Sequence, residues 1–139
     1  MSSNPKIGAE QLKVGQEREL VVVENLTRTQ IVQYAGASGD FNPIHHDETF
    51  ASKAAGYPSV FAHGMLTMGM TGRMLTNYVG DGRLTKYGVR FTNQVWPGDT
   101  LNSTATVEEV SDGWVKLNVQ TTNQDGTVVL SGYAEARVD

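Results

Sequence analysis

The segment FAHGMLTMGMTGRMLTNY, residues 61–78, decides the fold of this chain. Read as one helix, it carries apolar side chains around most of its circumference: Met65, Leu66, Met68, Met70, Met74 and Leu75. A helix that is apolar nearly all round is expected to be buried. Each glycine inside it costs about 1 kcal/mol relative to alanine, which is tolerable where backbone or a ligand must come close. These glycines are Gly64, Gly69 and Gly72.

The rest of the chain predicts a sheet to cover this helix. Apolar runs and alternation predict strands, whose ranges are 18–24, 84–91, 99–110, 114–119 and 127–138. Glycine-containing turns at 111–113 and 124–126 join the last three strands as hairpins. We therefore expect an α+β fold in which an antiparallel sheet curls around one central apolar helix.

A second helix is predicted ahead of the central one. Thr27 stands three residues before Gln30, a capping-box pattern that opens a helix through about Ala37. Its expected core-facing stripe is Ile31, Val32 and Ala35. One or two more helical turns are expected over 47–53, followed by a loop at 56–59.

The stretch ASGDFNPIHHD, residues 37–47, holds the candidate chemistry. Its glycine, asparagine and proline favour a bent loop, so Asp40 and His45 are offered where two side chains can converge. An acid and a base aimed at one water are the minimum equipment for adding water to a carbon chain or removing it. At the start of the central helix, the free N–H groups after His63 and Gly64 could stabilise a carbonyl oxygen that gains negative charge.

Composition bounds the remaining possibilities. We expect the 139 residues to form one domain, with residues 11–139 as its body and residues 1–10 as a flexible tail. The net charge of −4, without a basic run, gives no sign of a nucleic-acid partner. The absence of cysteine excludes disulfides and fits a reducing cytoplasm, where we expect the protein to reside. No apolar segment has the length of a signal peptide core or a membrane span.

Three segments together resemble one family. Tyr34 with SGDFNPIHHD, then AHGML, then VRFTNQVWPGDTL over 89–101, look like the MaoC-like (R)-specific enoyl-thioester hydratases and dehydratases of the hot-dog superfamily. Within that branch, AHGMLTMG and the single-domain length are most similar to actinobacterial (3R)-hydroxyacyl dehydratase subunits. The resemblance implies reversible hydration of trans-2-enoyl thioesters to (3R)-3-hydroxyacyl thioesters in fatty-acid metabolism, without a metal or cofactor.

The resemblance also implies roles for residues of this chain. Asp40 and His45 would be the catalytic dyad, in either order of proton transfer, and the Gly64 N–H would bind the enolate oxygen. Asn42 would brace the loop, and His46 would be a surface residue. Some relatives carry a serine at the position of Gly72. The network that holds the water would then be smaller here, or completed by other hydroxyl groups: Ser59, Thr67 or Thr71.

Partners follow from the same resemblance. The substrate would be a thioester of coenzyme A or of acyl carrier protein, in a tunnel at the interface of a homodimer or of a heterodimer with a related hot-dog chain. Unpaired edge strands also favour a dimer. Cations between residues 73 and 90 could dock the phosphate-bearing carrier: Arg73, Arg83, Lys86 and Arg90.

Three other functions are alternatives. A metal site could be built from His45, His46, Asp47 and His63, although their spacing matches no familiar ligand pattern. A hot-dog thioesterase would usually carry its carboxylate on the central helix, which has no Asp or Glu. A non-catalytic subunit, which binds acyl chains or stabilises a partner, would be expected to lack the Asp or the His. Activity of the single chain on crotonyl-CoA separates that alternative from an enzyme.

Overall fold

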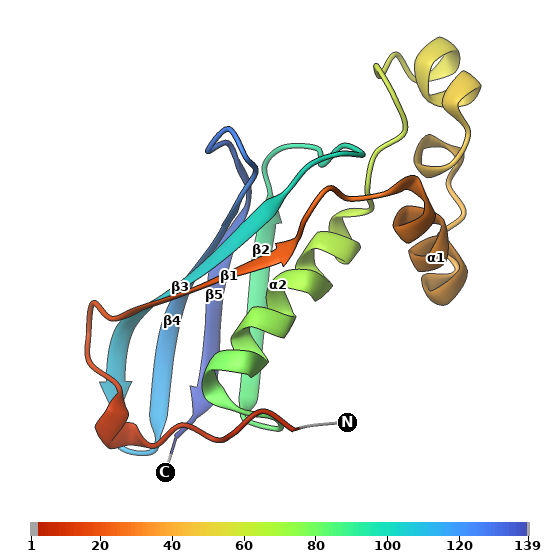
Figure 1. The fold of residues 1–139 in the computed structure, drawn as a ribbon. Helices are drawn as coiled ribbons and strands as arrows, with labels where there is room; N and C mark the ends of the chain where they lie inside the picture. Colours follow the sequence, from red (N-terminus) through yellow and green to blue (C-terminus); the bar gives the residue numbers. More distant parts are fainter. Residues whose placement is uncertain (1–2, 139) are drawn as a thin grey trace.

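The computed structural model describes residues 3–138, which form one five-stranded antiparallel sheet with a long helix on one face (Figure 1). The strand order is β1-β3-β4-β5-β2, so β1 and β2 are the edges. The strands are β1 (Glu17–Val23), β2 (Leu84–Phe91), β3 (Leu101–Ser111), β4 (Trp114–Thr122) and β5 (Val128–Arg137). The helices are α1 (Arg28–Ser38) and α2 (Gly64–Val79), with short helical turns at Ala9–Gln11, Pro43–His45 and Phe50–Ala54. The predicted sheet around one helix is confirmed.

The three long strands follow the predicted alternation. In β3, every second residue from Leu101 to Val107 is buried against α2, and the residues between them are half-buried. Gly113 and Gly126 adopt φ values of 73° and 79°, so the two predicted hairpin turns use residues that tolerate the left-handed region. β3 begins two residues later than predicted because the Asp99 N–H closes a turn on the Trp96 carbonyl.

Helix α2 is buried on one side only, which corrects the prediction of a helix buried all round. Its buried residues are Thr67, Thr71, Met74, Leu75, Tyr78 and Val79. Met65 is 55% exposed, and Gly69 and Arg73 on the same side are exposed as well. One sheet can cover only one face of a helix, so the opposite apolar face of α2 stays open in a single chain.

A cluster of three hydroxyl groups lies inside this core. Thr71 of α2, Ser103 of β3 and Thr121 of β4 are each 0% exposed. Their oxygens form a closed triangle of hydrogen bonds, with distances of 3.2, 2.7 and 2.7 Å. Each buried hydroxyl therefore has partners, which removes most of the cost of burying it.

Residues 24–63 leave the sheet and stand beyond the N-terminal end of α2 (Figure 1). The predicted capping box is present: the Thr27 side chain accepts from the Gln30 N–H, and Gln30 accepts from the Thr27 N–H. Ile31 and Ala35 are buried, but Val32 is 53% exposed, so its prediction as a core residue is wrong. Because α1 does not lie on the sheet, only a narrow side of it is covered.

The N-terminal segment contacts the far end of α2. The Ile7 N–H donates to the Val79 carbonyl at 3.2 Å, and Asn4 forms two hydrogen bonds with the carboxylate of Asp81. The described part of the predicted tail therefore touches the domain, and its first two residues lie outside the described part. Among residues 3–138, no helix combines the length and the apolar character that crossing a membrane requires.

Candidate active site

The loop between α1 and the turn Pro43–His45 presents Asp40 at the surface. Helix α1 ends at Gly39, whose φ of 78° turns the chain sharply. One oxygen of the Asp40 carboxylate accepts the Asn42 N–H at 3.2 Å, and the Asn42 side chain accepts the Ile44 N–H at 3.2 Å. Asn42 thus holds the loop through two hydrogen bonds in sequence, in the bracing role that its position predicts.

His45 ends this loop and is nearly buried. Its Nδ1 lies 2.6 Å from the Phe61 carbonyl oxygen, which can only accept, so Nδ1 carries a proton. In the neutral ring, Nε2 is then left as an acceptor. Burial lowers the pKa of His45, opposed by the hydrogen bond to Phe61, with smaller effects from His63, Asp40 and His46. The lowered pKa favours the neutral ring, whose Nε2 can accept a hydrogen bond from a water molecule.

His63 joins the two members of the predicted dyad. It is 2% exposed, and its Nε2 donates to the main-chain carbonyl of Asp40 at 3.0 Å. Its ring stacks on that of His45, with centroids 3.9 Å apart and planes 27° from parallel. The only sequence signal for this role is the position of His63 directly before the helix-start glycine, and the sequence by itself does not predict the contact of His63 with the dyad.

The side chains of Asp40, His45 and His63 could be considered as metal ligands, because one ligand atom of each lies within 4.8 Å of the others. Two stacked rings direct their lone pairs along nearly parallel planes, whereas zinc requires ligands that converge tetrahedrally. Of the four metal ligands considered from sequence, the structure brings only His45 and His63 together. His46 Nε2 is bonded to the Phe41 carbonyl, and the Asp47 carboxylate accepts the Phe50 N–H.

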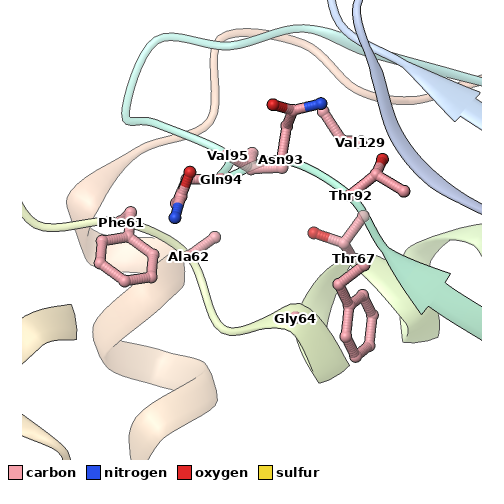
Figure 2. Close-up of a pocket in the computed structure, with 10 residues that line it drawn as sticks. Phe61, Ala62, Gly64, Thr67, Thr92, Asn93, Gln94, Val95 and Val129 are labelled. Atoms are coloured by element: carbon pink, nitrogen blue, oxygen red, sulfur yellow. The ribbon is translucent and has the colours of Figure 1, made fainter.

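A cavity of about 250 Å³ lies at the start of α2 (Figure 2). Its lining includes Gly64 and Thr67 of α2, Phe91 at the end of β2, and the following loop with Asn93 and Gln94. Figure 2 shows Gly64 at the helix start and the two amide side chains on the loop across from it. Donors of the first helical turn could therefore reach a carbonyl oxygen of a bound molecule.

The segment Phe61–Gly64 separates the cavity from the dyad. Phe61 and Ala62 line the cavity, while the Phe61 carbonyl accepts from His45 and His63 stacks on His45. Asp40 and His45 themselves do not line it. The acid–base pair therefore contacts the short segment Phe61–Gly64, and three residues of that segment line the cavity.

The hydroxyl groups considered for the water network occupy different places. Thr67 lines the cavity, whereas Thr71 belongs to the buried triangle. The Ser59 hydroxyl donates to the Val60 carbonyl and lies 3.5 Å from the Arg28 guanidinium. Of the three candidates, only Thr67 borders the cavity.

Gly72, the departure from the family pattern, lies against Tyr87 of β2. A Cβ at position 72 would come 3.4 Å from the Tyr87 ring. The Tyr87 hydroxyl donates to the Met68 carbonyl at 2.7 Å, and burial raises the pKa of this tyrosine. The ring therefore occupies the space next to Gly72, two turns of α2 away from Gly64.

The four predicted docking cations are not gathered around the cavity. The Arg73 guanidinium donates to the Val22 carbonyl at 2.6 Å, on the opposite edge of the sheet from β2. Arg83 donates to the Arg137 carbonyl, near the C-terminal end of β5. Lys86 pairs with Glu135 at 3.6 Å, and strand alternation directs Lys86 and Arg90 away from the face that holds Tyr87 and Phe91. Carrier docking at these side chains stays a prediction.

The sequence and the fold of this chain are similar to those of known proteins. The sequence model of the family described as a MaoC-like domain matches residues 9–129. Dehydratase Y for 3-hydroxyacyl thioesters, from Mycobacterium tuberculosis, is 36% identical over 104 residues, or 73% of this chain and 33% of that protein. The R-hydratase PhaJ1 of Pseudomonas aeruginosa superimposes with a TM-score of 0.85 at 28% identity, covering 99% of this chain and 88% of the other.

A further solved structure is the ChsH1–ChsH2 complex of Mycobacterium tuberculosis. It superimposes with a TM-score of 0.75 at 27% identity, covering 91% of this chain and 98% of the matched one. The predicted hot-dog fold is thereby confirmed. The chain spans only a third or less of the length of the first curated relatives that it matches, with shares of 33%, 6% and 32%.

Proposed function

Because the chain belongs to the MaoC-like domain family, we propose that it hydrates trans-2-enoyl thioesters to (3R)-3-hydroxyacyl thioesters, or catalyses the reverse dehydration. One observation carries this proposal. A carboxylate oxygen of Asp40 and a ring nitrogen of His45 lie within 4.8 Å of each other. Because His45 Nδ1 donates to the Phe61 carbonyl, Nε2 is left as the acceptor of the neutral ring. A carboxylate and a neutral imidazole at this separation can hold one water between them.

The proposed hydration needs two proton transfers and one charge to be stabilised. As the water oxygen bonds to the β-carbon, one member of the dyad accepts a proton from that water. The electron pair of the carbon–carbon double bond moves toward the thioester carbonyl, whose oxygen gains negative charge. The Gly64 N–H would donate to this oxygen. The proton taken from the water passes to the other member of the dyad, which returns it to the α-carbon, so that both groups end in the states in which they began.

Crotonyl-CoA hydration by the purified single chain tests the proposal, followed as loss of the conjugated enoyl absorbance. Asp40→Asn and His45→Ala should each lower the rate by about 10²–10⁴-fold, the usual contribution of a positioned acid or base. His46→Ala is the matched control, because the His46 side chain is exposed and its hydrogen bond is to the Phe41 carbonyl, outside the dyad. Chiral analysis should find the (3R) product.

The outcome also decides between an enzyme and a non-catalytic acyl-binding subunit. A wild-type chain that binds crotonyl-CoA without converting it, alone and with a related hot-dog chain added, supports the subunit. Activity at the wild-type level in both dyad variants, with their folds intact, would rule out Asp40 and His45 as the catalytic pair.

The proposed working unit is a dimer, either of two copies or with a related hot-dog chain. The unpaired edge strands β1 and β2 and the open face around Met65 support this proposal. The solved ChsH1–ChsH2 complex is a heteromeric example among similar proteins. Light scattering that finds a stable monomer of 15.1 kDa at micromolar concentration would contradict the homodimer.

The acyl carrier is either coenzyme A or acyl carrier protein. Comparing the specificity constants for crotonyl thioesters of the two carriers tests this choice. Charge-neutralising variants at the predicted docking cations should raise the Michaelis constant for the preferred carrier and spare turnover of a pantetheine thioester. These cations are Arg73, Arg83, Lys86 and Arg90.

A further inference from the structure

We propose that His63 is a positioning residue that fixes the acid–base pair of Asp40 and His45 relative to the backbone donor of Gly64. The inference deepens the proposed function and rests on it. His63 thereby connects the groups that move protons to the group that stabilises the oxyanion.

His63 contacts both members of the pair through different forces. Its Nε2–H holds the main chain of Asp40 by a hydrogen bond of 3.0 Å. Its ring face lies on that of His45 at 3.9 Å. The loop residue and the end of the loop are therefore both fixed to one side chain, 23 residues away from Asp40 along the chain.

The backbone of the same residue begins α2. His63 has extended dihedral angles, φ −63° and ψ 138°, and its carbonyl accepts the N–H groups of Leu66 and Thr67. Gly64 follows directly as the first helical residue. Any shift of the His63 backbone would move the Gly64 N–H, and any shift of its ring would move the dyad.

A structural role alone does not account for a histidine here. His63 is 2% exposed, and its Nδ1 is buried without a hydrogen-bond partner among the described residues. Leaving a buried polar atom unpaired costs about 1–3 kcal/mol, which an aromatic hydrocarbon ring of similar size would avoid. The stack on His45 could be made by phenylalanine, so the feature that requires histidine is the Nε2–H bond to Asp40.

His63 also influences the charge that His45 can carry. Groups facing His45 are Asp40 from the same loop, His46 next to it in sequence, His63 from the start of α2, and the Phe61 carbonyl. Asp40 and the carbonyl favour the protonated ring, whereas His63 and His46 oppose it. Replacing His63 by an uncharged residue should therefore raise the pKa of His45.

Two substitutions separate the ring from the donor. His63→Phe keeps an aromatic face for His45 and loses the Nε2–H, whereas His63→Gln loses the ring and keeps an amide N–H that can reach the Asp40 carbonyl. His46→Gln is the matched control, since His46 also bonds a main-chain carbonyl but is exposed. Circular dichroism and thermal unfolding verify that each variant is folded.

For crotonyl-CoA hydration, we expect His63→Phe to lower kcat by about 10²-fold, the effect of misplacing reacting groups by about 1 Å. The Michaelis constant should change less than about threefold, because His63 does not line the cavity. His63→Gln should recover about tenfold of the lost kcat. His46→Gln should keep the wild-type kcat and raise the pKa of His45 less than His63→Phe does, because His46 has the smallest of the effects on that pKa. In His63→Phe, the acid limb of the pH profile should move to higher pH.

The imidazole resonances of His45, followed by NMR during a pH titration, give a readout that needs no activity. A raised pKa of His45 in His63→Phe supports the inference even if the chain hydrates no enoyl thioester, in which case only the proposed function fails. If the wild type is active and both His63 variants keep its kcat and its His45 titration, the inference is wrong. A folded His63→Gln that is no better than His63→Phe would overturn the role of the Nε2–H.

Discussion

Adding a methyl group at Gly64 should lower the activity strongly and change the stability little. In Gly64→Ala, the new Cβ would lie 2.9 Å from Cδ2, 3.0 Å from Cε2 and 3.1 Å from Cγ of the Phe91 ring. The ring must withdraw by about half an ångström to restore ordinary carbon–carbon contact near ~3.5 Å. Phe91 is 50% exposed at the end of β2, so its ring has room to move.

The expected loss of stability is small. Overpacking a closed core costs about 1–3 kcal/mol, and the exposed ring places this site at the low end, about 1 kcal/mol. Alanine is the better helix former, by up to about 1 kcal/mol, which offsets much of that cost. The melting temperature should therefore change by less than about 4 °C.

The expected loss of activity is large. An oxyanion must come within about 2.7–3.1 Å of its donor, and the methyl group would stand at the cavity wall formed by Gly64. We expect kcat/KM for crotonyl-CoA to fall by about 10²-fold, which corresponds to about 2.7 kcal/mol of transition-state stabilisation. Steady-state kinetics and thermal unfolding of the same preparations measure both quantities.

Two further variants make the experiment decisive. Gly36→Ala lies in helix α1 with no atom within 4 Å of its built Cβ, so it should stabilise the protein and leave kcat/KM unchanged. Adding Phe91→Ala to Gly64→Ala removes the clash and should restore stability without restoring activity. Gly64→Ala with wild-type kcat/KM would refute the assignment of the oxyanion donor to the first turn of α2.

Three further outcomes are expected. Asp99→Ala should lower the free energy of unfolding, measured in urea, by about 2–3 kcal/mol. The nearly buried Asp99 carboxylate accepts from the Trp96 N–H and from the Gln124 side chain, each at 2.9 Å, and both donors would lose their partner. Asp99→Asn should recover part of this loss. Folding lowers the pKa of His45, so below about pH 6.5 the unfolded chain binds more protons than the folded one. The free energy of unfolding should therefore fall as the pH drops below that value, and it should fall less in His45→Gln. Crotonyl-CoA hydration should survive dialysis against a chelator, and activity lost with the chelator and restored by one metal ion would contradict a mechanism carried by side chains alone.

Local interactions made several features predictable from sequence. The capping box of Thr27 and Gln30 spans three residues, so its hydrogen bonds form wherever that segment becomes helical. The turn at Gly113 and the loop around Asp40 likewise depend on neighbours along the chain. The resemblance of the loop and helix start to one family extended this local information to a function class.

The features that the sequence did not reveal depend on segments brought together from a distance. Val32 was expected in the core because its spacing suits a buried stripe, yet the position of α1 beyond the sheet leaves it exposed. Lys86 and Arg90 are close in sequence to Phe91, which lines the cavity, but they lie on the other face of β2. No pattern within a short window records which side of an element its neighbours will cover.

The amino-acid sequence by itself determined the order of helices and strands, the bend that offers Asp40 and His45, and the glycine at the start of α2. Only the tertiary structure decided that α2 is covered on one face, that Phe91 lies over Gly64, and that His63 joins the dyad. The physical reason is the range of the forces. Turns, caps and alternation arise between residues a few positions apart, whereas packing and buried hydrogen bonds join residues whose separation in sequence is unconstrained.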